Sequence, residues 1–203
     1  MGLPAVLLFG TAFGMLHALE ADHLAAVAAL AARDGTLRGT VRQGVAWGAG
    51  HALTLLAFGG AVLLLGAVID TRTAAVLEAT VGAMLVALGA DLLRRLLRER
   101  SAQVSAPRMP MRAIAVGMMH GLAGSAALVL LALEQVGSPL VGGIYILMFG
   151  LGSIAGMATL SVAIALPLRL TAARLAVLNR VLQAAIATFS VGLGLQLLYR
   201  NLA

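Results

Sequence analysis

Residues 76–95 read VLEATVGAMLVALGADLLRR, and residues 181–200 read VLQAAIATFSVGLGLQLLYR, with nine identities in twenty positions. Both stretches are predominantly apolar. An α-helix rises about 1.5 Å per residue, so twenty residues are enough to cross a hydrocarbon layer about 30 Å thick. A spanning helix that occurs twice in one chain predicts a membrane protein built from two related halves.

The composition of the whole chain agrees with a membrane protein. Hydrophobic residues make up 61% of the 203 residues, 11% are charged, and the mean hydropathy is +1.01. A soluble domain carries roughly 25% charged residues, so this surface suits lipid rather than water. The chain has no cysteine, which excludes disulfides, thiolate metal sites, iron–sulfur clusters and cysteine nucleophiles.

Six apolar segments can be separated, and they predict an all-α polytopic membrane protein with six transmembrane helices. The segments cover residues 3–32, 44–69, 73–93, 113–135, 138–166 and 175–199. All fourteen basic residues are arginine, and six crossings put twelve of them on one side, with Arg72 and Arg200 opposite. The positive-inside rule places the twelve in the cytoplasm, so we expect both termini outside the cell's inner (plasma) membrane.

The arginines also bear on targeting and partners. The first of them, Arg33, follows the first apolar segment, so we expect no cleaved signal peptide and a retained N-terminus. They are neither clustered in one patch nor interleaved with aromatic residues, so the net charge of +6 is a topology signal and no nucleic-acid partner is expected. The expected surroundings are the lipid bilayer, and a homo-oligomer is compatible with the sequence.

Two further matches, in the same order along the chain, relate the halves. Residues 15–30 match 118–133, and WGAGH at 47–51 matches FGLGS at 149–153. Because each copy has three helices, an odd number, the copies must enter the membrane in opposite orientations, as in many secondary transporters. The expected division is a first repeat over residues 1–100, a cytoplasmic linker over 101–112, and a second repeat over 113–203. GxxxG spacings predict close helix packing in both repeats; they begin at Gly10, Gly44, Gly117 and Gly152.

The chemistry is concentrated in the first apolar segment, where residues 17–23 read HALEADH. One charged side chain at the centre of a bilayer costs about 2.5–3.5 kcal/mol on insertion scales, so this group needs a partner, and a cation is the simplest one. On a straight helix His17 and His23 are about 9 Å apart along the axis, too far to share an ion. Either the helix unwinds there, or His17 and Glu20 form a relay separate from a site at Asp22 and His23.

Two more histidines fall at a comparable depth. His51 and His120 both lie about 12–14 Å from the expected cytoplasmic boundary, as does His23. His51 is a candidate ligand; His120, the repeat partner of His17, is a candidate for closing the site or relaying protons. A hydrogen bond to a neighbouring helix is the simpler alternative for each lone histidine. Imidazole with carboxylate suits nickel, cobalt, zinc or copper(II), whereas magnesium and calcium prefer oxygen ligands.

The stretch HALEADHLAAV resembles the H-x4-D-H helix signature of the nickel/cobalt transporter family (NiCoT, and the wider NicO group), and GAGHAL resembles the motif on that family's next helix. The stretch HGLAGSAAL at 120–128 is similar to the short, UreH-like branch of that group. The resemblance implies that His17, Asp22, His23 and His51 handle the metal, with Glu20, His120 and Ser125 in supporting or relay positions. Two departures concern these residues. Glu20 stands where the family usually has aspartate, and Gly124 and Ser125 replace the acidic motif that larger members carry in their second half.

These observations favour a permease that carries nickel or cobalt by alternating access between the two repeats. The metal is then the transported substrate, and no cofactor is expected. Two alternatives stay open: a proton-linked exporter of another small cation or solute, and a membrane scaffold for assembly of a metalloenzyme such as urease. An enzyme is not expected, because no cofactor motif or nucleophile arrangement accompanies the histidines.

Overall fold

The computed structural model describes residues 3–32, 36–65, 70–98, 111–123 and 138–202. All of the regular structure in these ranges is helical, which confirms the all-α class, and the ranges contain no strand. The helices are α1 (Leu3–His17), α2 (Ala21–Ala31), α3 (Leu37–Leu65), α4 (Thr71–Leu97), α5 (Met111–Leu122), α7 (Pro139–Arg174) and α8 (Ala176–Leu202). Residues 101–110 of the expected linker, and the candidate Ser125, lie outside the described ranges.

Several of these helices are suited to a bilayer. The α4 and α8 helices and residues Leu140–Ala172 of α7 are each long and apolar enough to cross a membrane, and the bent pair of α1 and α2 adds a fourth span if it is counted as one. The chain is therefore a membrane-embedded helical protein. The six crossings expected from the apolar segments stay a prediction.

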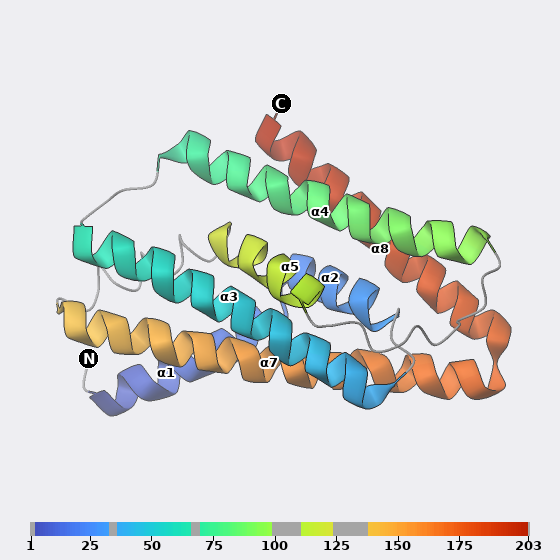
Figure 1. Cartoon of the computed structure of the whole chain (residues 1–203), viewed down its shortest axis with the longest axis horizontal. Coiled ribbons are helices and arrows are strands. Elements are labelled where there is room, and N and C mark those ends of the chain that lie inside the picture. Colours follow the sequence, from blue (N-terminus) through green and yellow to red (C-terminus); the bar gives the residue numbers. More distant parts are fainter. Residues whose placement is uncertain (1–2, 33–35, 66–69, 99–110, 124–137, 203) are drawn as a thin grey trace.

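The long helices surround two short ones. In Figure 1, α4 and α8 lie together along one side of the molecule, α1, α3 and α7 lie along the other, and α2 and α5 are between them. The principal pairs are α4 with α8, α3 with α7, α1 with α7 and α3 with α5. This arrangement places α2 and α5, which carry half of the chain's histidines, between the two layers of long helices.

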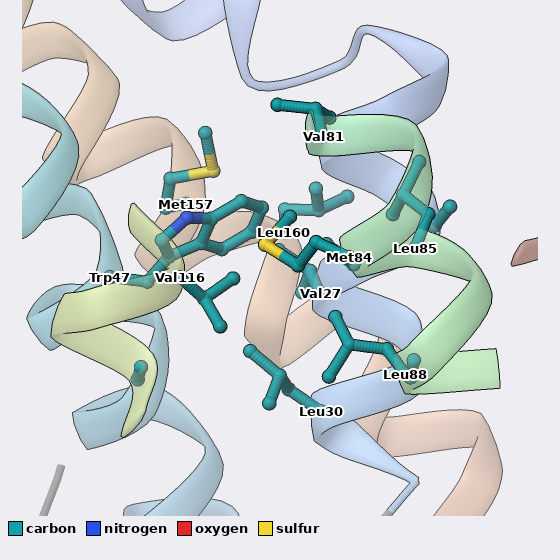
Figure 2. Packing of buried hydrophobic residues seen from close by; sticks show 14 of the residues in the cluster. Val27, Leu30, Trp47, Val81, Met84, Leu85, Leu88, Val116, Met157 and Leu160 are labelled. Atoms are coloured by element: carbon teal, nitrogen blue, oxygen red, sulfur yellow. The ribbon is translucent and has the colours of Figure 1, made fainter. Parts of the chain in front are cut away.

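The core that holds these layers is apolar and continuous. Val27 and Leu30 of α2 pack with Met84 and Leu85 of α4, and Trp47 of α3 closes the cluster (Figure 2). Burying side chains of this size from water contributes about 1.5–3 kcal/mol each, although in a bilayer close packing rather than water exclusion holds helices together. The core therefore fixes α2 against α3 and α4, directly beside the break between α1 and α2.

The ends of α4 and α8 are joined by polar contacts. Arg200 lies 2.9 Å from the carboxylate of Glu78, and at the opposite end the Arg180 guanidinium donates to the carbonyl oxygen of Leu96 at 3.4 Å. The end of α8 is thus beside the start of α4, and the start of α8 is beside the end of α4. The two helices whose sequences match at nine positions run antiparallel.

Candidate metal centre

The first apolar segment is not one straight helix. The α1 helix ends at His17 and α2 begins at Ala21, and their axes are inclined by 61°. At the break the backbone N–H groups of Leu19 and Glu20 donate across three residues rather than four, and Glu20 then takes an extended conformation with ψ 148°. As a result, the ring centroids of His17 and His23 are 4.4 Å apart.

Four imidazoles meet at this break. His17 and His23 flank it, His51 comes from the middle of α3, and His120 comes from α5. The His51 ring lies 5.3 Å from the rings of His17 and His23, and the His120 ring lies 4.6 Å from that of His23. All four side chains are buried, with no more than 4% of any residue exposed. Every histidine of the chain is therefore in one cluster.

Six ring nitrogens of this cluster make no hydrogen bond to the part of the chain that the structure describes. They are Nε2 of His17 and of His23, and both ring nitrogens of His51 and of His120. Leaving a buried polar atom unsatisfied costs about 1–3 kcal/mol, so such atoms are rare in folded proteins. The nitrogen of a neutral imidazole is also a common metal ligand. Six such atoms in one place are suited to binding a metal ion.

Two carboxylates contact three of the rings. Glu20 Oε1 lies 2.7 Å from Nδ1 of His17, and Asp22 Oδ1 lies 2.9 Å from both Nδ1 and the backbone nitrogen of His23. The second oxygen of Asp22, Oδ2, lies 3.2 Å from Nε2 of His120. A carboxylate that accepts a hydrogen bond from the N–H of one ring nitrogen fixes the tautomer and leaves the other nitrogen free for a metal. Glu20 and Asp22 are placed to do this for His17 and His23.

Ligand-type atoms converge in two overlapping groups. The imidazole group consists of His17, His23 and His51, and the mixed group consists of Asp22, His23 and His120. Within each group the three ligand atoms lie no more than 4.8 Å from one another. Zn–N and Zn–O bonds measure about 2.0–2.2 Å, so small side-chain adjustments would bring either set onto one ion.

Two aromatic rings cover the centre. Trp47 stacks on His23, with ring centroids 5.6 Å apart, and Phe149 of α7 lies 5.3 Å from His17. Both aromatic residues are buried. An apolar shell of this kind limits access of water to a metal site and lowers the local dielectric constant. The sequence pattern did not mark these two residues as site residues, although WGAGH and FGLGS match each other.

Comparisons with other proteins agree with the sequence pattern. The urease accessory protein UreH of Bacillus sp. (strain TB-90) is 32% identical over 194 residues, which are 89% of this chain and 85% of that protein. The chain belongs to the UreH-like branch of the nickel/cobalt transporter family. No protein-family model and no solved structure matches the chain. Membership in this family confirms the resemblance seen in the HALEADH and GAGHAL stretches.

The residues singled out by that family resemblance lie together in the structure. His17, Asp22, His23 and His51 line the break between α1 and α2. Of the two arrangements left open by the sequence, the structure has the interrupted helix, and His17 belongs to the same group as His23 rather than to a separate relay. Whether these UreH-like residues bind a metal stays a prediction.

Proposed function

We propose that this protein transports a divalent transition-metal ion across the membrane, with nickel or cobalt as the substrate. The observation that carries the proposal is the convergence of three buried imidazoles, His17, His23 and His51, from three helices. Each has a ring nitrogen without a hydrogen-bond partner among the described residues. Imidazole and carboxylate together suit these metals. The urease accessory role in the name of the Bacillus relative favours nickel, the metal of urease.

A repeat symmetry supports alternating access as the mechanism. Gly14 of α1 and Gly117 of α5 occupy matching positions in the two halves. A Cβ atom on Gly14 would overlap the carbonyl oxygen of Phe149, and a Cβ atom on Gly117 would overlap that of Trp47. Phe149 and Trp47 are themselves a matching pair. Each half therefore packs its first helix on the second helix of the other half through the same glycine contact.

The contacts between imidazole and aromatic rings at the metal centre follow the same repeat symmetry. His17 contacts Phe149 with ring centroids 5.3 Å apart, and its counterpart His120 contacts Trp47 with centroids 5.4 Å apart. The antiparallel pairing of α4 with α8 is what two copies in opposite orientation require. These contacts support an inverted pair of three-helix repeats with the metal centre at the repeat interface.

The proposed topology completes the mechanism. Six crossings put the twelve arginines in the cytoplasm and both termini outside the inner membrane. The metal centre then lies near the middle of the bilayer, at the break in the first span, as in transporters with discontinuous helices. Rocking of one repeat against the other would expose the centre to each side in turn.

Uptake into proteoliposomes tests the proposal. The purified chain is reconstituted with a nickel-sensitive dye in the lumen, and uptake is compared with that of a His23→Ala, His51→Ala double variant. We expect uptake by the variant to fall by about tenfold or more, because two of three imidazoles are lost. Asp91→Asn, which alters a carboxylate paired with Arg95 at 3.3 Å on α4, should transport normally. Wild-type uptake no greater than that of the double variant would contradict transport.

A second function, a membrane scaffold for metalloenzyme assembly, is favoured by the name of the Bacillus relative. The scaffold requires a soluble partner and no flux of metal. Copurification of a stable partner in stoichiometric amount, together with proteoliposomes that take up no nickel, would favour the scaffold over the transporter.

A further inference from the structure

His23 is the one residue that the imidazole group and the mixed group share. Its Nδ1 faces Asp22 Oδ1 at 2.9 Å, so Nε2, which makes no hydrogen bond to the described residues, is the nitrogen open to a metal. The remaining ligands divide by location. His17 and His51 belong to α1 and α3 in the first half of the chain, whereas His120 belongs to α5 in the second half.

The contact between Asp22 and His120 suits two ligands of one metal as well as a direct ion pair. Oδ2 and Nε2 are 3.2 Å apart. Two ligand atoms that each lie about 2.1 Å from one metal, with a ligand–metal–ligand angle of about 90°, are about 3 Å apart. The separation observed for these two atoms therefore fits an ion that binds both.

Charge does not separate the two groups strongly. The mixed group includes the carboxylate of Asp22, and the same carboxylate lies 2.9 Å from Nδ1 of His23, which is also a member of the imidazole group. The negative charge of Asp22 therefore stabilises a divalent ion in either position. Both groups need Nε2 of His23, and one imidazole nitrogen binds one ion, so one chain holds one ion at a time.

We propose that the centre has two overlapping metal positions, and that transport requires the ion to pass between them by ligand exchange while His23 stays bound throughout. The first position is the imidazole group, and the second is the mixed group, which joins the two halves of the chain through His120. The proposal rests on the transport function proposed above. It gives His120 a role in ion transfer that is separate from the capture of the ion.

Ligand exchange at a shared residue avoids a step in which the ion has no protein ligand. The ion releases His17 and His51 as it gains Asp22 and His120, so the number of protein ligands stays at three. Because the mixed position exists only while α2 and α5 are adjacent, its occupation depends on how the two halves are arranged. Motion of the halves therefore makes or breaks the second position and leaves the first intact.

The test separates binding from transport. His120→Gln keeps an N–H group that can donate to Asp22 but lacks the imidazole. We expect this variant to bind one Ni²⁺ per chain, by isothermal titration, with an affinity within about threefold of wild type, while uptake into proteoliposomes falls by about tenfold or more. Two results for this variant would overturn the proposal of two metal positions. One is uptake at the wild-type rate, and the other is the loss of both Ni²⁺ binding and uptake. If wild type itself takes up no Ni²⁺, the transport function falls, and this proposal falls with it.

A crystal of the wild-type protein decides the question if His120→Gln does not fold. Anomalous scattering from bound Ni²⁺ should give two partly occupied peaks, one within the imidazole group and one within the mixed group, with a total of one ion per chain. A single fully occupied peak bound by all four histidines would overturn the proposal.

Discussion

The indole of Trp47 stacks on the imidazole of His23, with ring centroids 5.6 Å apart and ring planes inclined by 22°. The same indole meets the His120 ring edge-on at 5.4 Å. Trp47 is the single tryptophan of the chain and is fully buried. The tryptophan fluorescence of the protein therefore comes from a residue in contact with the candidate metal centre.

This contact predicts that nickel binding quenches tryptophan fluorescence. Ni²⁺ has an open d shell and accepts excitation energy at contact distance, so one bound ion should remove more than half of the emission. Zn²⁺, whose d shell is full, should bind at the same place and quench much less. A fluorescence titration measures both. His23→Ala should abolish the quenching by Ni²⁺, and equal quenching in that variant would place the metal elsewhere.

The affinity for Ni²⁺ should depend strongly on Asp22, although its side chain is partly exposed. Its carboxylate is 26% exposed, but Oδ1 holds the His23 ring and Oδ2 faces His120. Asp22→Asn keeps the shape and loses the charge, and we expect Ni²⁺ affinity to fall by about 10–100-fold, the usual effect of losing a group that orients a ligand. Isothermal titration measures the change. A variant that binds as tightly as wild type would mean that this carboxylate neither orients nor binds.

Glu20→Gln changes the other carboxylate at the break between α1 and α2 and is the matched comparison for Asp22→Asn. Glu20 holds His17 at 2.7 Å but is 45% exposed, so water can take its place more easily. We expect a smaller loss of Ni²⁺ affinity from Glu20→Gln than from Asp22→Asn. The reverse order would indicate that orientation of His17 limits binding.

Local pattern predicted the helical class and the composition of the site, but not the shape of the first helix. The expectation that His51 and His23 can meet required only a count of residues along two antiparallel helices, and their rings lie 5.3 Å apart in the structure. The break after His17 could not be derived, because HALEADH contains no proline or glycine and suits a straight helix equally well. Its conformation depends on contacts with residues distant in sequence, such as Phe149 beside His17.

Other features depended on the repeat rather than on local pattern. His120 and Asp22 are in contact although they are about a hundred positions apart in the sequence. The expected similar depth of His120 and His23 was the only indication of this contact. Nothing in WGAGH distinguishes a tryptophan ring that packs on a metal ligand from one that packs on leucine. Long-range packing decides such contacts, and an apolar sequence leaves many packings open.

The antiparallel contact of α4 with α8 predicts opposite effects for two neighbouring glycines. A Cβ atom on Gly194 would lie 2.8 Å from the backbone nitrogen of Val86 in α4, whereas a Cβ atom on Gly192 would have no atom within 4 Å among those considered. We expect Gly194→Ala to lower the free energy of unfolding by about 1–3 kcal/mol through overpacking. Gly192→Ala should be neutral or stabilise by up to about 1 kcal/mol, because alanine favours a helix. Thermal unfolding in detergent compares the two; equal losses would contradict the packing.

The start of α4 should depend on pH through Asp70, outside the spanning part of the helix. Its carboxylate accepts hydrogen bonds from the hydroxyl and the N–H of Thr73, at 2.7 and 2.9 Å, and these bonds hold the pKa of Asp70 below its ordinary value of 3.8. A lowered pKa in the folded protein means that the cap stabilises the helix fully above the ordinary value, and that this stabilisation is lost as pH falls through the lower one. Hydrogen exchange of the first turn, corrected for the intrinsic effect of pH, should therefore rise in acid. Asp70→Asn, which caps comparably but does not titrate, should show no such rise, and an equal rise in that variant would assign the effect to another group.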